Sequence, residues 1–237
     1  MVGIKELEWL AVVARAIVQD VLAKGSPELG KNYGAIEDDA ALPFIGAQSI
    51  PGQVTQTTLI KAQCLFGRAI QIKVPADGRR TATSGSMAVV ESTVFGALVH
   101  ELVHVRQFNL DSSSFQATSA RQRESEAAGL QRTSSEWLAT YYIEPLEREA
   151  HAYQLAAELR CIGLTPAGND PHGSWTKATE VGRRIHGRLF PPGTAHDEGV
   201  EAWWRAFLAT AAEIGADWTA GPAAALSAPN EARDDDA

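Results

Sequence analysis

The chain has 237 residues, 45% of them hydrophobic, which is enough for one sizeable core. Its formal net charge of −8 argues against a nucleic-acid partner, because such a partner requires a basic surface. The only two cysteines, Cys64 and Cys161, are too few for a disulfide scaffold and are expected to be buried thiols. We therefore expect a single domain over residues 1–218 and a disordered tail rich in Ala, Pro and Asp over residues 219–237.

The first predicted element is an amphipathic helix over residues 4–24. Its apolar residues recur at helical spacing, and Gly25 closes it. Charged residues interrupt the segment and no small-residue cleavage site follows, so it fits neither a signal peptide nor a membrane span. We therefore expect no membrane partner and, by default, a cytoplasmic location, with export by a non-classical route left open.

Short strands are predicted between residues 45 and 90. Residues 70–74 alternate apolar and polar side chains between a Gly and a Pro, which is typical of a half-buried strand. Residues 87–90 are a second candidate strand, and the segment 77–85, rich in Gly, Arg, Thr and Ser, suggests a hairpin or a mobile loop. Either strand could form a sheet edge that pairs with an extended peptide. An ordinary core strand fits each pattern equally well.

The helix predicted over residues 91–109 carries the most informative motif, HELVH at residues 100–104. Two histidines four residues apart lie on one face of a helix, so both imidazoles can bind one cation. Glu101 is rotated by about 100° from His100, which keeps its carboxylate off the metal and lets it serve as a general base. The surrounding residues are apolar, and buried imidazoles or carboxylates are costly unless hydrogen-bonded, paired or metal-bound. The motif therefore predicts a metal site.

The rest of the chain is predicted to be mainly helical. The further helices are expected over residues 118–140, 145–162, 175–188 and 198–215. Together with the short strands, they predict a helix-dominated α+β fold.

A catalytic zinc ion normally takes three protein ligands and a water, so a third ligand is expected downstream of the two histidines. The helix over residues 145–162 begins with acidic residues around a Pro that fits its first turn. Glu144, Glu147 and Glu149 are the candidate ligands in this segment. Glu149 lies about 200° around the helix from Glu147, so the two cannot face one metal ion.

These residues together resemble the gluzincin group of zinc metallopeptidases, in which HExxH is followed by a helix with a ligand Glu, often as E-x-x-x-D or E-x-x-A-N. The matching string here is EREAH at residues 147–151. The resemblance implies a zincin-like fold with a small sheet beside the active-site helix, and Glu101 as the catalytic base. The Zn²⁺ ligands that it implies are His100, His104 and Glu147. His151 stands where the family has Asp or Asn, and it is a candidate for supporting a ligand through a hydrogen bond.

A narrower resemblance involves the string HELVHVRQ at residues 100–107. It is similar to the H-E-L-x-H-V-x-Q string of bacterial zincin-like domains found with contractile injection systems and related toxins. Those domains also have an upstream Gly-Arg-x-Ile-like stretch, which the GRAI string at residues 67–70 resembles. This similarity covers less than half of the chain and keeps a bacterial effector role among the options.

Peptide hydrolysis also requires a hydrogen-bond donor for the oxyanion that develops on the scissile carbonyl. The candidate donors are Tyr141, Tyr142, Arg184 and His186. The tyrosines directly precede the predicted ligand helix, although a tyrosine pair there is more often packing. His186 belongs to a charged segment that is more often a solvated helix face. His172 and His196 lie in loops rich in Pro and Gly and receive no role.

Three functions fit the sequence. The first is a zinc peptidase that acts on a peptide or protein substrate, and the second is an inactive zincin-like scaffold in binding, regulation or toxin delivery. Glu101 favours the first over the second, because a scaffold needs no base. The third is a chance motif in a helical structural protein. Two imidazoles and one carboxylate can also bind ferrous iron, but a base beside them favours zinc hydrolysis. The substrate, the cleavage position and the oligomeric state lie beyond the sequence.

Overall fold

The computed structural model describes residues 2–24, 28, 30–34, 42–50, 61–65, 67–75, 84–127, 141–142, 144–164, 170–173, 178–193 and 198–219. Its helices are α1 (Ile4–Lys24), α2 (Ser84–Leu110), α3 (Ser112–Ala127), α5 (Pro145–Cys161), α6 (Glu180–Leu189) and α7 (Glu198–Thr219). Its strands are β1 (Phe44–Ile50), β2 (Lys61–Leu65) and β3 (Ala69–Pro75). These elements confirm a helix-dominated α+β fold. Among the described helices, none combines the length and apolarity that a bilayer span requires.

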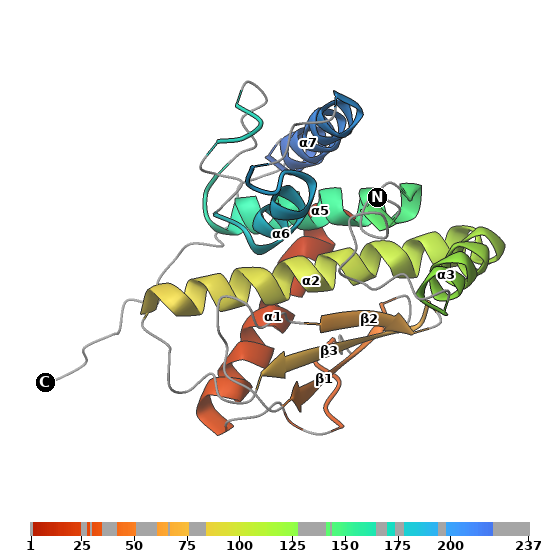
Figure 1. Ribbon diagram of the computed structural model, residues 1–237. Helices are drawn as coiled ribbons and strands as arrows, with labels where there is room; N and C mark the ends of the chain where they lie inside the picture. The colour runs from red at the N-terminus through yellow and green to blue at the C-terminus, as the bar shows by residue number, and fades with distance from the viewer. Residues whose placement is uncertain are drawn as a thin grey trace, which may run out of the picture.

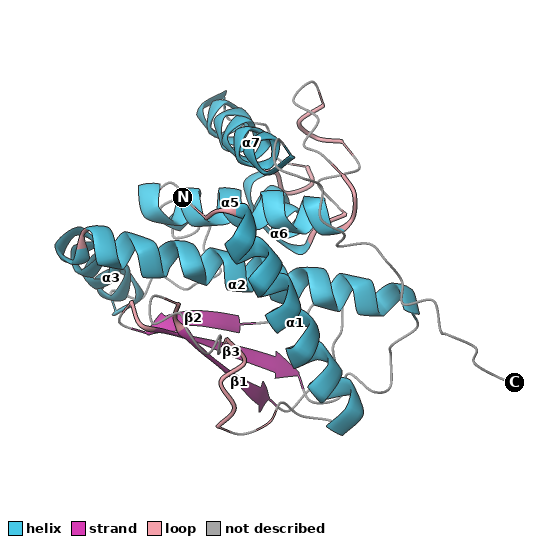
Figure 2. Cartoon of the chain, turned by 180° about the vertical axis from the view of Figure 1, so that it is seen from behind, coloured by secondary structure: helices cyan, strands magenta, loops and turns pink. Residues whose placement is uncertain are grey.

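The long helix α2 runs through the middle of the molecule (Figure 1). The sheet packs on one side of it, α1 crosses behind it, and α5 packs on the side opposite the sheet, followed by α6 and α7. Seen from behind, α1 crosses α2 obliquely (Figure 2). This central position explains why the α2 sequence is apolar nearly all round.

Most predicted helices are confirmed, with differences at their ends. α1 has the predicted bounds, α5 begins at the predicted residue, and α7 extends to Thr219, the first residue of the predicted tail. α2 begins at Ser84, so the candidate strand over residues 87–90 is wrong. A short apolar run has no periodicity that separates a strand from a buried helix, and here the run continues into α2. The predicted segments 77–83, 128–140 and 220–237 lie outside the described residues.

The three-stranded sheet has the order β1-β3-β2, with β3 parallel to β1 and antiparallel to β2. The prediction of a strand over residues 70–74 is therefore confirmed, but its use as an edge is wrong because β3 is central. Ile70, Ile72 and Val74 are fully buried on one face, as the alternating pattern requires. The edge strand that packs against α2 is β2.

The helix α5 is buried on both sides because it separates two apolar cores. Ala150, Tyr153 and Ala156 belong to the core formed with α1, α2 and the sheet. Leu155 and Leu159 belong to the core formed with α6 and α7. Both cores thus fix the position of α5 against α2, and the two predicted metal-binding segments face each other across this contact.

Gly96 allows α2 to approach α5 closely. A Cβ atom at this position would lie 2.6 Å from Glu158 Cγ, a side chain that is itself buried. We expect Gly96→Ala to lower the free energy of unfolding by about 1–3 kcal/mol, because the added methyl overpacks the contact. Urea unfolding measures this change. Gly187→Ala on α6 is the matched control, since nothing lies within 4 Å of its added Cβ. An unchanged stability of Gly96→Ala would contradict the close packing of α2 and α5.

Candidate metal centre

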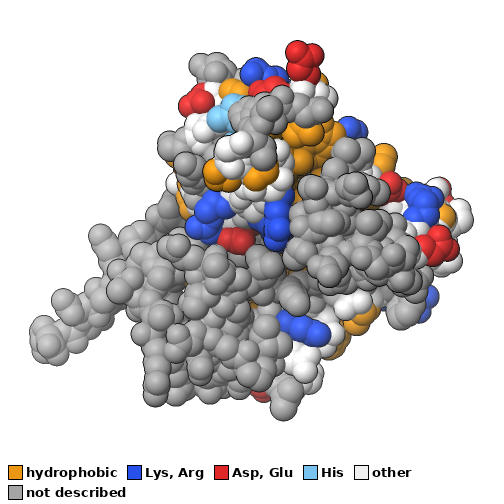
Figure 3. Space-filling model, in the orientation of Figure 1, with side chains coloured by type: hydrophobic (Ala, Val, Ile, Leu, Met, Phe, Trp, Pro, Cys, Tyr) orange, Lys and Arg blue, Asp and Glu red, His pale blue; other side chains and the backbone are white. Residues whose placement is uncertain are grey.

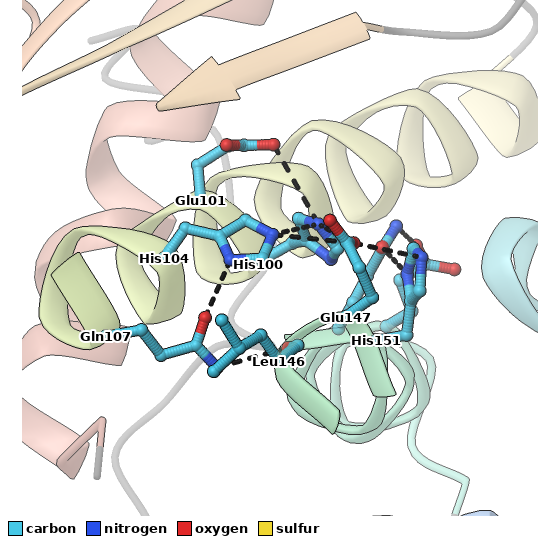
Figure 4. Close-up of polar contacts among 9 residues, drawn as sticks. His100, Glu101, His104, Gln107, Leu146, Glu147 and His151 are labelled. Carbon is cyan, nitrogen blue, oxygen red and sulfur yellow. Dashed lines mark hydrogen bonds and ion pairs between the residues drawn. The ribbon is translucent and has the colours of Figure 1, made fainter. Parts of the chain in front are cut away.

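Two histidines from α2 and one glutamate from α5 bring one ligand atom each to a common point (Figure 4). The Nε2 atoms of His100 and His104 are 3.0 Å apart, and Glu147 Oε2 lies 3.6 Å and 3.5 Å from them. Tetrahedral zinc with bonds of about 2.0–2.2 Å separates its ligand atoms by about 3.3–3.6 Å. Both distances to Glu147 match this separation, and the two imidazole nitrogens lie somewhat closer together. All three side chains are buried. The donor set therefore fits one small divalent cation.

Helix geometry explains why these residues meet. The two histidines are one turn apart on α2, and Glu147 lies in the first turn of α5, which begins at Pro145. The alternative ligands lie elsewhere. Glu144 accepts hydrogen bonds from α3, and the exposed Glu149 accepts one from Gln107 Nε2 at 2.9 Å. Glu147 is therefore the glutamate that faces the two imidazoles.

Gln107 holds the imidazole of His104 in place. His104 Nδ1 donates to Gln107 Oε1 at 2.8 Å, and the amide nitrogen of Gln107 donates to the Leu146 carbonyl on α5 at 3.1 Å. A proton on Nδ1 leaves the lone pair on Nε2, which is the atom at the centre of the cluster. Gln107 thus orients a ligand and links α2 to α5. Only its place three residues after His104 in the motif could have indicated this role.

We expect Gln107→Leu to weaken zinc binding by about 10- to 100-fold, as is usual when a group that supports a metal-binding histidine is lost. Competition with a zinc chelator measures the affinity. Gln116→Leu, at an exposed position of α3, is the matched control and should leave the measured metal affinity unchanged. Equal zinc affinity in both variants would show that Gln107 does not orient His104.

Glu101 lies beside the cluster without joining it. Its Oε1 atom is 4.0 Å from His100 Nε2, and the backbone N–H of Cys64 in β2 donates to its carboxylate. Burial raises the pKa of Glu101 to about 7, with the charge of Glu147 acting in the same direction. A carboxyl group with a pKa near neutrality can both accept a proton and return it.

The cluster is electrostatically coupled. Burial disfavours the charged forms of both Glu147 and His104. Their close contact outweighs burial, so the pKa of Glu147 falls to about 2 and the pKa of His104 rises to about 9. The pKa of His100 is lowered, chiefly by burial and then by its imidazole neighbours. Without a bound ion, the contact between Glu147 and His104 therefore favours the carboxylate and the protonated imidazole. Metal binding must displace the proton of His104.

The two tyrosines lie on one side of the cluster. Burial and the charge of Glu147 raise the pKa of Tyr141 well above its ordinary value, and its hydroxyl is hydrogen-bonded to Glu147. The protonated phenol therefore donates a hydrogen bond to the carboxylate of Glu147, the third candidate ligand. The buried ring of Tyr142 packs 5.2 Å from the ring of His151.

His151 ends a buried hydrogen-bonded chain that begins at α6. The Val181 N–H donates to Glu158 Oε2 at 3.1 Å, and Gln154 Nε2 donates to Glu158 Oε1 at 2.8 Å. The oxygen of Gln154 is then left for His151 Nδ1, 3.3 Å away, which places the proton on Nδ1 and a lone pair on Nε2. His151 Nε2 and His100 Nδ1 are both buried without a hydrogen-bond partner among the described residues. The two rings lie with their centroids 4.4 Å apart, and His151 Nε2 is 3.9 Å from Glu147 Oε2.

The two candidate donors on α6 point in different directions. Burial, and next the charge of Arg184, lower the pKa of His151. The side chain of Arg184 therefore lies on the face of α6 that is directed toward the cluster. His186 lies two residues further, about 200° around the helix. It packs with His172, Phe190 and Trp204 in a separate group of rings.

Comparisons of the chain with protein-family models, with curated proteins and with solved structures give no match.

Proposed function

We propose that the protein is a zinc-dependent peptidase of the gluzincin type, with a zincin-like fold. The observation that carries the proposal is the buried convergence of His100, His104 and Glu147, with the carboxyl group of Glu101 alongside. Two imidazoles and a carboxylate also suit ferrous iron, but a carboxyl base beside the ligands favours zinc-dependent hydrolysis. Bound zinc supplies Lewis acidity, which activates water and polarises a carbonyl group.

Proton transfer and the positioning of the ligands depend on residues of the chain. Glu101 accepts a proton from the attacking water and passes it to the leaving amine, since its pKa suits both directions. The Cys64 N–H holds the Glu101 carboxylate in place. Tyr141 and Gln107 hold Glu147 and His104 through hydrogen bonds, so that the ligands keep one orientation.

We propose that an extended peptide binds along the edge of β2 that faces away from β3. Since the Cys64 N–H points to Glu101, it points away from β3, and the backbone groups of Ala62, two residues earlier, point the same way. An extended substrate that pairs with Ala62 would pass directly beside Glu101. Strand addition of this kind gives affinity through main-chain hydrogen bonds and depends little on the substrate sequence.

The test is cleavage of an unfolded protein substrate by the full chain before and after metal removal. We expect one tightly bound zinc ion per chain at the centre. Chelation should stop the appearance of new amino termini, and added zinc should restore it. Zinc binding without any cleavage would instead support an inactive scaffold. Absence of stoichiometric metal, with or without cleavage, would refute the proposed centre.

A further inference from the structure

A second pair of histidines lies beside α6 and α7, outside the metal centre. His172, in the turn 170–173, and His186, on α6, bring two ring nitrogens within 3.0 Å of each other: Nδ1 of the first and Nε2 of the second. The two imidazoles of the metal centre have the same separation, 3.0 Å. Neighbouring nitrogen ligands with bonds of about 2.0–2.1 Å lie about 2.8–3.4 Å apart on one ion. The spacing therefore suits a shared metal ion.

A carboxylate holds one of these imidazoles in a metal-binding tautomer. His172 Nε2 donates to Glu201 Oε2 at 2.9 Å, and the other oxygen of Glu201 accepts from Arg205 Nε, also at 2.9 Å. With its proton on Nε2, His172 carries its lone pair on Nδ1, the atom that meets His186. Histidines that bind metals commonly donate their second nitrogen to a carboxylate in this way.

Both histidines are held by contacts that need no ion. The turn that carries His172 is closed by a hydrogen bond from the Gly173 N–H to the Asp170 carbonyl at 3.1 Å, and Trp204 Nε1 donates to the Pro171 carbonyl at 2.7 Å. The ring of His186 packs 5.7 Å from the ring of Trp204. Since both rings are placed in advance, an ion that binds them has little ordering cost.

Solvent reaches this pair. The side chain of His172 is 34% exposed, and a histidine side chain is visible at the surface beside α7, among acidic and basic side chains (Figure 3). Water can therefore complete the coordination of an ion held by two imidazoles. The centre on α2 and α5 differs in this respect, because its three ligands are buried.

We propose that His172 and His186 form a second metal site, for a divalent transition metal of the Zn²⁺, Ni²⁺ and Cu²⁺ class. Imidazole nitrogen is a favoured ligand of these ions. Without an ion, His186 Nε2 donates a hydrogen bond to His172 Nδ1 over the same distance. The site is independent of the peptidase proposal and binds more weakly than the buried centre, because it supplies two protein ligands instead of three.

The test is calorimetric titration of Zn²⁺ into the metal-free, tag-free full chain. We expect two classes of site in the unchanged protein. His172→Gln and His186→Gln should each lose the weaker class and keep the tighter one, which also shows that these variants fold. His104→Gln should lose the tighter class and keep the weaker one, so the second site is counted even if the first proposal fails.

Glu201 gives a finer test of the same site. We expect Glu201→Gln to weaken the second class by about 10- to 100-fold, because the amide can present either an acceptor or a donor to His172. Glu198→Gln, an exposed change in the same first turn of α7, is the matched control and should leave the affinity unchanged. The same number of zinc sites in the unchanged protein and in both histidine variants would overturn the proposal.

Discussion

Replacement of Glu101 by Gln is expected to abolish peptide cleavage while one zinc ion stays bound at the centre. The amide keeps the shape of the side chain and can still accept the Cys64 N–H, but it cannot take a proton from water. General-base catalysis contributes about 100- to 10,000-fold, so kcat/KM should fall by at least about 100-fold. Cleavage and metal content are measured on the same sample.

Glu91→Gln is the matched control, because Glu91 is the other glutamate of α2 and is paired at the surface with Arg15. It should keep both cleavage and zinc. Glu101→Gln should also unfold at no lower temperature than the unchanged protein, since burial disfavours the charged form of this side chain. Cleavage retained in Glu101→Gln would refute the role of Glu101 as base. Loss of zinc in that variant would instead place Glu101 among the ligands.

Glu147→Gln is expected to lose both the metal and the activity. Residues that only support a ligand account for about 10- to 100-fold in affinity, so loss of a ligand itself should exceed that range. The variant also removes the carboxylate that faces the imidazole of His104 at 3.5 Å. Zinc affinity is measured by chelator competition, and cleavage of the same substrate is followed in parallel.

Glu149→Gln provides the comparison within the same helix turn. Glu149 is exposed and, among the described residues, its hydrogen bond to the cluster runs through Gln107, so its loss should change zinc affinity by less than about 10-fold. Glu144→Gln should behave similarly, since Glu144 is engaged by α3. If Glu147→Gln kept its zinc while either of these variants lost it, the third ligand would be misassigned.

The parts of the site that depend on local spacing could be predicted from the sequence. The i, i+4 spacing of His100 and His104 and the phase of Glu147 after Pro145 are properties of single helices, and the periodicity that reveals a helix also orients its side chains. The three residues therefore needed only one long-range contact, between α2 and α5, in order to meet.

The parts that depend on pairing between distant segments could not. β2 is only five residues long, and its position at the sheet edge follows from its register with β3, which leaves no periodic trace. The contacts of Gln107 with α5 likewise join residues 39 and 42 positions apart. His172 and His186 meet because a turn folds back on α6, so local sequence spacing could not predict their contact.

The position of α5 between two cores has a consequence for how the site responds to its ion. Apolar packing on both faces, rather than a metal, holds Glu147 opposite the α2 histidines. The centre is therefore preorganised, and the binding energy of an ion is not needed to fold the chain, in contrast to small zinc-dependent domains. The metal-free protein should keep its secondary structure and most of its thermal stability. A metal ion should then enter and leave the centre without unfolding the chain.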